Sequence, residues 1–332
     1  MYCTVLCKKS TCLAFKVLGL FKSEFPALQQ KKSRKKNFPK PHRIAMLYSA
    51  HLWQRVLSLL TIREQAMSIR GVSRFFRESS DEYMRRFWSE PILHLPQDSS
   101  CLARAIEMCQ YLTAQEEYVE GTTVVVELGS GVYEVVGSCK VPGWGTCQQT
   151  LSFPCDNLSI VGKGSSETII LGSLVTENGM SSSVKGVTVK NLSGIGLVVF
   201  GEGTKMEISR VTIEECTSAG VYVTDGAKLI ATGCQFHQNG VSGLSVSGST
   251  TTACLINCTS HHNKSDGVCS SSGAVVNLMG EGTSVHDNKG YGLYALSGAI
   301  NIYQPCVLDD MSYGNKRENI SMRYGGTIQQ KR

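Results

Sequence analysis

Residues 243–266 read GLSVSGSTTTACLINCTSHHNKSD, and residues 267–291 read GVCSSSGAVVNLMGEGTSVHDNKGY. Each stretch begins with Gly and an apolar residue, has a second Gly five or six residues later, and has an Asn four residues before the next copy. The flanking sequence continues the pattern, with 23 to 25 residues between successive Gly–apolar pairs. Self-similarity at a fixed interval of about 20 to 50 residues is the signature of a solenoid or a related repeat architecture.

The repeat consists of three aligned columns of residues. The Gly–apolar pairs begin at Gly196, Gly220, Gly243, Gly267 and Gly292; the second glycines are Gly203, Gly226, Gly248, Gly273 and Gly298; the asparagines are Asn239, Asn263, Asn288 and Asn315. Between the columns the sequence indicates short β-strands, which excludes helical and leucine-rich repeats. A coil of about 24 residues with three short strands and three turns is one rung of a parallel β-helix. The predicted fold class is mainly β, a parallel β-helix solenoid of about eight coils.

This register places one apolar column in the interior and gives the asparagines a structural role. The inward column is Leu197, Val221, Leu244, Val268 and Leu293. Side-chain amides in consecutive turns can bond to one another and to the turn backbone, so we interpret the four asparagines as a ladder. A helix is predicted over 99–113, where it would cap the open N-terminal edge of the solenoid. The β-helix domain with this cap is predicted over 98–325.

Positive charge is concentrated at the N-terminus. The chain has 332 residues and a net charge of +6, but residues 1–46 hold 11 Lys or Arg against the single acid Glu24, which leaves −4 for the rest. We expect a basic, disordered arm over 1–46, which is either a nuclear-localisation or acidic-surface patch or a solvated run upstream of a start at Met46. The body is not basic enough to hold nucleic acid, and no apolar stretch reaches the length of a membrane span.

The cysteines and the N-terminal sequence favour an intracellular protein. The chain has 14 Cys but no C-x2-C pair, which predicts free thiols. The apolar stretch at 13–21 is interrupted by Lys16 and has no recognisable cleavage site for secretion. We expect the protein in the cytoplasm, the nucleus or both.

Residues 47–90 have a helical period instead. The order of residue types resembles the F-box motif, a small three-helix unit, in Val56-Leu57-Ser58-Leu59-Leu60, Arg63-Glu64, Val72-Ser73-Arg74-Phe75-Phe76-Arg77 and Phe87-Trp88. Two positions depart from the motif, because Tyr48-Ser49 stands where it has Leu-Pro and Glu64-Gln65 where it has Asp-Leu. The resemblance implies that a Skp-type adaptor binds the apolar residues Leu52, Val56, Leu60, Val72 and Phe75. The alternative is a small helical cap for the next domain.

Residues 98–325 resemble the pectin-lyase-like right-handed β-helices, in the capping helix, the strands at 124–134 and 158–164, and the coils. That fold hosts polysaccharide lyases and hydrolases, and also non-enzymatic binding proteins. Glycoside hydrolysis needs two carboxylates that converge on one bond. The register puts Asp225 and Asp266 in different columns, and Asp309-Asp310 has no matching partner in a neighbouring coil. We predict no catalytic residue, no metal site and no cofactor.

Taken together, the two resemblances imply an F-box protein whose β-helix is the substrate receptor of a Skp-cullin-F-box ubiquitin ligase. Such a chain would work as a monomer within a complex that contains the Skp-type adaptor, a cullin scaffold and an unknown substrate protein. The alternatives are a carbohydrate-active or carbohydrate-binding β-helix protein and a scaffold without a link to ubiquitin.

Two surface columns are candidate partner-binding sites. His237, His261 and His286 each lie two residues before a ladder Asn, so they should stack on successive coils. Three such imidazoles could bind a metal or an acidic peptide, and peptide binding would then strengthen as the pH falls through about 6.5. The alternative is a row of half-exposed polar side chains. On another strand, Tyr222 and Tyr294 are predicted to point outward as contact residues.

Overall fold

The computed structural model describes residues 90–95, 101–114 and 118–332, apart from the side chain of residue 112. The predicted basic arm 1–46 lies outside the described residues. So do Leu52, Val56, Leu60, Val72 and Phe75, on which the resemblance to the F-box motif depends.

Three long parallel sheets make up the described unit, and successive strands of one coil belong to sheet 1, sheet 2 and sheet 3 in turn. Sheet 1 contains β1 (Ile92–Leu95), β2 (Val124–Leu128), β7 (Leu158–Gly162), β10 (Ser181–Lys185), β13 (Lys205–Ser209), β16 (Lys228–Thr232), β19 (Thr252–Ile256), β22 (Val275–Met279), β25 (Ala299–Tyr303) and β28 (Thr327–Lys331). Sheet 2 contains β3 (Gly131–Glu134), β8 (Thr168–Leu171), β11 (Thr188–Lys190), β14 (Thr212–Glu214), β17 (Gln235–His237), β20 (Thr259–His261), β23 (Ser284–His286) and β26 (Ser312–Tyr313). Sheet 3 contains β6 (Thr150–Ser152), β9 (Ser173–Thr176), β12 (Leu197–Phe200), β15 (Val221–Thr224), β18 (Leu244–Ser247), β21 (Val268–Ser271), β24 (Leu293–Leu296) and β27 (Ile320–Arg323).

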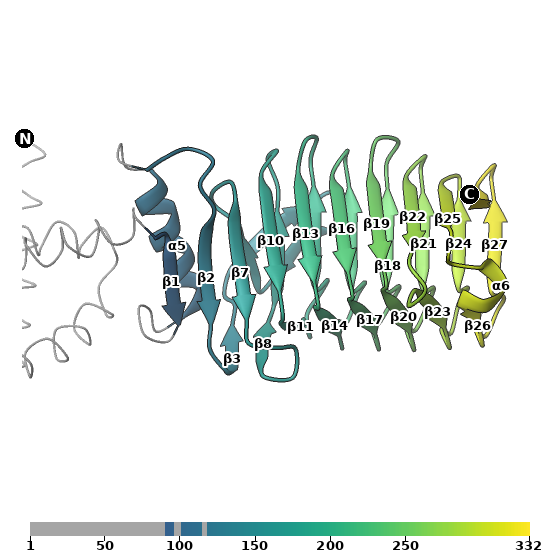
Figure 1. The fold of residues 1–332 in the computed structure, drawn as a ribbon, viewed down its shortest axis with the longest axis horizontal. Helices are drawn as coiled ribbons and strands as arrows, with labels where there is room; N and C mark the ends of the chain where they lie inside the picture. Colours follow the sequence, from purple (N-terminus) through teal and green to yellow (C-terminus); the bar gives the residue numbers. More distant parts are fainter. Residues whose placement is uncertain (1–89, 96–100, 115–117) are drawn as a thin grey trace, which may run out of the picture. The chain divides into compact units, whose positions relative to one another are not determined.

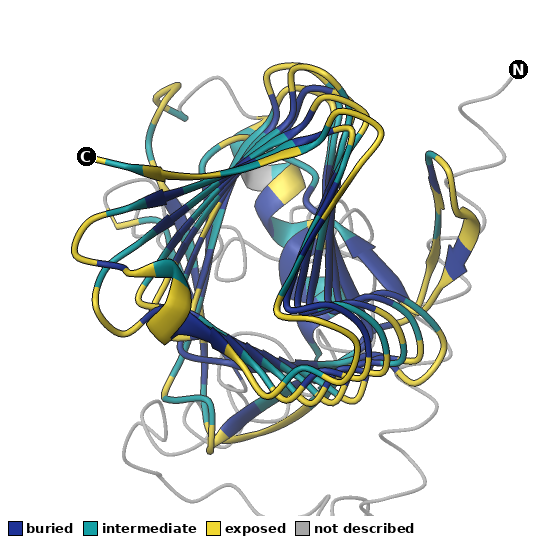
Figure 2. Cartoon of the chain, turned by 90° about the vertical axis from the view of Figure 1, so that its right-hand side faces the viewer, coloured by how far each residue is buried: buried dark blue, intermediate teal, exposed yellow. Residues whose placement is uncertain are grey.

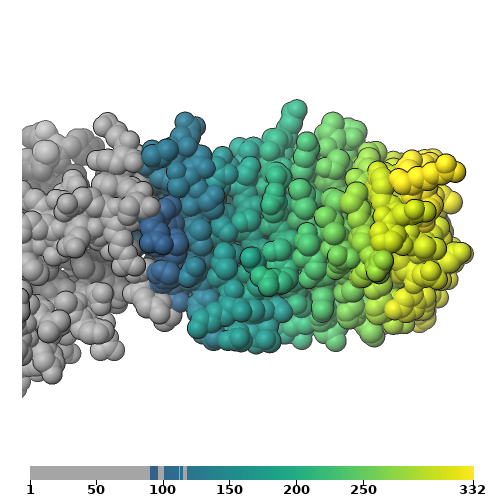
Figure 3. Space-filling model, in the orientation of Figure 1, coloured from purple at the N-terminus to yellow at the C-terminus, as the bar shows by residue number. Residues whose placement is uncertain are grey.

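The coils stack in sequence order, so each strand pairs with the strand one coil earlier and the strand one coil later (Figures 1 and 3). The end view in Figure 2 shows the strands of successive coils superimposed around a buried interior. This arrangement confirms the predicted β-solenoid of about eight coils.

The predicted inward column is present in register. Leu197 pairs with Val221, Val221 with Leu244, Leu244 with Val268, and Val268 with Leu293. All five side chains are fully buried. Each coil therefore covers the apolar edge of its neighbour, which an isolated coil would leave exposed.

Helix α5 (Leu102–Thr113) confirms the predicted cap, because it packs on β1 and β2 and buries Leu102, Ala105, Ile106 and Cys109 in the main core. Strand β1 begins at Ile92, six residues before the predicted domain start, and pairs in parallel with β2. Its four residues lie outside the repeat, so the columns give no signal for it. A second short helix, α6 (Leu308–Met311), interrupts the last full coil. Among the described residues, no helix has the length and apolar character needed to cross a membrane.

An antiparallel hairpin, β4 (Ser138–Val141) with β5 (Gly145–Gln148), was not predicted. Its residues Val141 and Cys147 belong to a second apolar cluster on the outer face of sheet 3, with Val175, Val198 and Tyr222. The hairpin therefore covers the outer surface of the early coils.

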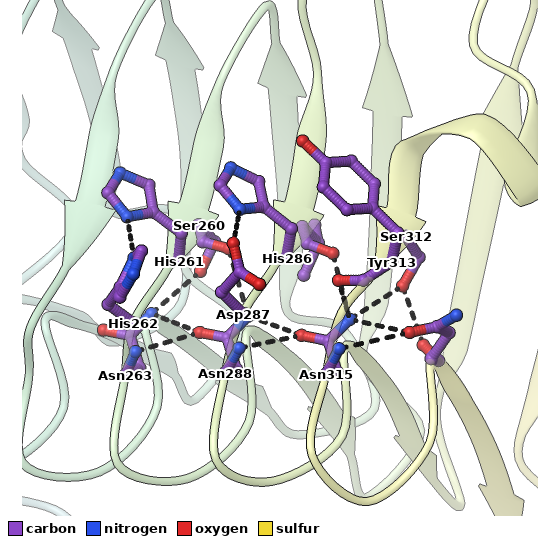
Figure 4. A network of polar contacts seen from close by, with 12 residues as sticks. Ser260, His261, His262, Asn263, His286, Asp287, Asn288, Ser312, Tyr313 and Asn315 are labelled. Carbon is purple, nitrogen blue, oxygen red and sulfur yellow. Dashed lines mark hydrogen bonds and ion pairs between the residues drawn. The ribbon is translucent and has the colours of Figure 1, made fainter.

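The asparagine ladder is confirmed and fully connected. The side-chain Nδ2 of Asn239 donates to Oδ1 of Asn263 (3.0 Å), Asn263 to Asn288 (2.9 Å) and Asn288 to Asn315 (2.9 Å). Each acceptor Oδ1 also receives the backbone N–H of the preceding ladder residue, at 3.0 to 3.1 Å. Figure 4 shows Asn263, Asn288 and Asn315 of this chain of amides along the turns. Because Asn239, Asn263 and Asn288 are buried and all four amides are paired, the ladder fixes the spacing of successive turns.

The ladder also explains the first glycine column. A Cβ added to Gly220, Gly267 or Gly292 would lie 2.5 to 2.7 Å from Nδ2 of the ladder amide of the next coil. Only Gly allows the strand to start this close to the ladder. In the second glycine column the reason is conformational, since Gly203, Gly226, Gly248 and Gly273 have φ between +77° and +104°.

Candidate functional site

The three histidines stack as predicted. His237, His261 and His286 occupy equivalent positions on β17, β20 and β23, and Tyr313 on β26 continues the column. The ring centroids are separated by 4.8, 5.0 and 4.8 Å, and neighbouring rings are within 9° of parallel. We call these four residues the histidine column. Figure 4 shows His261, His286 and Tyr313 on the same side of the ladder.

Acidic groups lie beside the column at two places. Oε2 of Glu214, on β14, lies 3.1 Å from Nε2 of His237, and its Oε1 accepts from Lys190 Nζ at 2.7 Å. At the third position, Nδ1 of His286 lies 2.8 Å from Oδ2 of Asp287, and this hydrogen bond lowers the pKa of the Asp287 carboxyl. The first and the last imidazole of the column therefore each contact a carboxylate of the same chain.

The central imidazole is held in its neutral form. Burial, together with the nearby His237, His286 and His262, lowers the pKa of His261 to about 4, against a small opposing effect of Asp287. Its Nδ1 lies 2.8 Å from Nδ1 of His262, a contact in which one imidazole must donate and the other accept. The expectation that the column gains charge near pH 6.5 is thus wrong for His261, because burial, and then the neighbouring imidazoles, penalise a charge on its ring.

Acid should therefore destabilise the protein through His261. Its pKa is about 4 in the folded chain against 6.5 for a free imidazole, so between these values the unfolded chain binds a proton that the folded chain does not. Lowering the pH from about 7 to about 5 should lower the melting temperature, and His261→Gln should reduce that drop. An equal drop in both proteins, or an NMR titration of His261 with a midpoint near 6.5, would contradict the assignment.

Of the two tyrosines predicted as contact residues, one is covered. Tyr222 is only 8% exposed, because the β4–β5 hairpin lies over it and Trp144 packs edge-on against its ring at a centroid distance of 5.7 Å. Tyr222 lies on the outer face of sheet 3 as predicted, but the prediction that it is a free contact residue is wrong, because the hairpin covers it. Tyr294 is half-buried, 5.0 Å from the ring of Tyr291, and stays a candidate.

The carboxylates of Asp225, Asp266 and Asp287 each have a different partner. Oδ1 of Asp266 accepts the backbone N–H of Tyr291 at 2.8 Å, and burial raises the pKa of Asp266. Oδ1 of Asp225 accepts from the hydroxyl of Thr224 at 3.2 Å, while Asp287 bonds His286. Within the part of the chain that the structure describes, no group of three or more His, Cys, Asp or Glu side chains is arranged to hold a metal ion.

Two hollows on the surface lie away from the histidine column. One, of about 220 Å³, is lined by Ser183, Lys185, Glu207 and other residues of sheet 1. The other, of about 300 Å³, lies between β1, β2 and β7, next to His94 and Glu127.

Sequence reasoning missed a set of lysines next to the ladder asparagines. Lys264, Lys289 and Lys316 directly follow Asn263, Asn288 and Asn315, and all three are exposed. The signal was present in the sequence as the repeated dipeptide Asn-Lys at the repeat interval.

Comparison with known families supports the fold. Residues 161–306 match the family model described as "Right handed beta helix region". The solenoid is a right-handed β-helix. No curated protein matches the chain.

Solved structures with a similar fold include three of different origin. The ORF18 protein of Geobacillus virus E2 has 10% identity and a TM-score of 0.42, and the match covers 68% of this chain and 55% of the viral protein. Carrot pectin methylesterase has 11% identity and a TM-score of 0.40, with 73% of this chain and 88% of the carrot enzyme covered. The A-module of the mannuronan C-5 epimerase AlgE4 of Azotobacter vinelandii has 15% identity and a TM-score of 0.34, with 63% and 83% covered.

Proposed function

We propose that this chain is the substrate-recognition subunit of a Skp-cullin-F-box ubiquitin ligase. In this proposal residues 47–90 bind the Skp-type adaptor, and the β-helix binds the protein to be modified. The chain supplies no catalytic group, because a recruited conjugating enzyme carries out the chemistry. It acts as a monomer within the complex, in the cytoplasm or nucleus.

The binding role is supported by the regular arrangement of side chains along the edge of the solenoid that contains the asparagine ladder. The buried amides hold successive turns at one spacing, so the side chains on both sides of the ladder form regular rows. One row is the histidine column, with half-buried imidazoles and the exposed ring of Tyr313. Such a pre-organised row can bind a partner segment that lies along several coils, without the entropy cost of ordering a loop.

The adaptor role is supported by the F-box-like order of residue types in residues 47–90. An apolar anchor at the centre of an interface commonly contributes about 2 kcal/mol or more, which corresponds to roughly 30-fold in affinity. Leu60→Asp and Val56→Glu should each abolish copurification of the full chain with a coexpressed Skp-type adaptor. Ser58→Asp is the matched control, because the helical period places Ser58 away from the apolar face.

The copurification of each variant is compared with its thermal unfolding, which checks that the β-helix is folded. The β-helix of each variant should keep the melting temperature of the parent, since the substitutions lie outside residues 98–325. If Leu60→Asp and Val56→Glu recovered as much adaptor as the parent does, the F-box role would be excluded.

A further inference from the structure

A row of three lysines, Lys264, Lys289 and Lys316, directly follows the ladder asparagines in successive turns. The backbone N–H of Lys264 donates to the carbonyl of Asn239 (2.9 Å), that of Lys289 to Asn263 (2.9 Å) and that of Lys316 to Asn288 (2.8 Å). These bonds place the three residues at the same position of successive coils. We call them the lysine column.

The lysine column is available to bind an anion. All three side chains are exposed, and none has an ion-pair partner among the described residues. Exposed Arg317 directly follows Lys316 and lies with its Cζ 5.5 Å from the ring centroid of Tyr291. The row therefore presents a line of cations, one per coil, with a guanidinium beside the last one.

Three carboxylates lie near this edge, of which two are engaged by other groups of the chain and one is exposed; the charge of Asp266 also interacts with that of Arg317. Asp287 is bonded to His286 on the histidine side of the ladder, and Asp266 is half-buried with its Oδ1 on the N–H of Tyr291. Glu318, two residues after Lys316, is exposed, and its carboxylate forms no ion pair among the described residues.

The distance between successive lysines along the solenoid axis favours one secondary structure in the partner. Neighbouring coils are 4.8 to 5.0 Å apart, as the stacked rings beside the ladder show. One turn of an α-helix rises about 5.4 Å, so residues i, i+4 and i+7 on one helical face stay in step with three lysines. An extended strand places same-face side chains about 6.8 Å apart and drifts by about 4 Å over two coils.

We infer that the lysine column docks an acidic α-helix of the partner protein, which lies along the solenoid axis with carboxylates at i, i+4 and i+7. The inference rests on the proposed receptor function, because it names the kind of segment that the substrate protein presents. The charge of the chain outside residues 1–46 is −4 overall, so a nucleic acid, whose phosphates would meet the whole solenoid, fits this edge less well than a short acidic segment does.

Two helix-stabilised peptides with the same composition test the inference on the full-length chain. In one, four glutamates lie on a single helical face; in the other, the same glutamates are distributed around the helix. Fluorescence anisotropy should show at least tenfold tighter binding of the one-faced peptide. The binding should weaken as salt is raised, because its pairs lie at the surface.

Charge-reversal variants locate the binding site. Lys264→Glu, Lys289→Glu and Lys316→Glu together should weaken binding of the one-faced peptide at least tenfold. The matched control is Lys185→Glu, Lys205→Glu and Lys228→Glu, which changes the net charge equally on the outer face of sheet 1, and it should weaken binding less than threefold.

Equal binding of the two peptides, equal loss in the two triple variants, or equally tight binding of a DNA duplex would overturn the inference. The assay contains no adaptor, so its result is independent of the adaptor test. A receptor whose lysine column binds no acidic helix would still copurify with the adaptor, whereas a failed adaptor test would leave the peptide result intact.

Discussion

Replacing Asn263 with alanine should destabilise the β-helix more than any surface change. The side chain of Asn263 is fully buried, and its Nδ2 donates to the carbonyl of Phe236 (3.0 Å) and to Oδ1 of Asn288 (2.9 Å). Its Oδ1 accepts the backbone N–H of Asn239 (3.1 Å). Truncation leaves several buried polar groups unpaired at about 1–3 kcal/mol each, so we expect a loss of roughly 3–5 kcal/mol.

Urea unfolding monitored by circular dichroism measures this loss. The matched control is Asn301→Ala, because Nδ2 of Asn301 also bonds an Asn one coil away, Oδ1 of Asn277 at 3.0 Å, but on the half-buried outer face of sheet 1. There the cost should stay below about 1 kcal/mol, because water can replace the lost partner. Similar midpoints for the two variants would show that burial of the ladder contributes nothing to stability.

Gly267→Ala should have the second largest effect. The added Cβ would lie 2.7 Å from Nδ2 of Asn288 and 2.9 Å from the carbonyl oxygen of Gly292, and it would overlap Cγ1 of Val285. Two of these neighbours belong to the ladder and the backbone of the next coil, so neither can move alone. Overpacking of this kind costs about 1–3 kcal/mol or more, and here we expect about 3 kcal/mol.

Gly164→Ala is the matched control for Gly267→Ala. A Cβ at Gly164 meets no atom within 4 Å, and its φ is not in the left-handed region. This substitution should leave stability unchanged or raise it by about 0.4–1 kcal/mol through the unfolded state. If the two variants had the same melting temperature, the close approach of the strand start to the ladder amide would not explain why glycine occupies the first column.

The repeat columns made the solenoid predictable from the sequence. Leu244, Asn263 and Gly267 recur at a constant interval, and residues that recur in this way must occupy equivalent places in stacked coils. The pairing of β18 with β21, and the amide bonds from Asn239 to Asn315, follow directly from that interval.

Features outside the repeat could not be predicted in the same way. The hairpin at 138–148 is inserted once, so nothing in the columns shows that it covers Tyr222. The low pKa of His261 depends on how deeply its ring is buried between two others, which the spacing alone does not give. The lysines of the lysine column are visible in the sequence, directly after the ladder asparagines. A row of charges on a turn has the same sequence pattern whether or not it binds a partner.

Native purification of the full chain, with quantification of the copurifying proteins, tests most directly whether one chain carries two independent binding modules. The parent should retain a Skp-type adaptor, a cullin and a partner protein with an acidic helix. Leu60→Asp should lose the adaptor and cullin but keep the partner, while the triple substitution of Lys264, Lys289 and Lys316 by glutamate should lose only the partner. Adaptor retained by Leu60→Asp, or a partner retained by the triple variant at the level of the parent, would contradict the account.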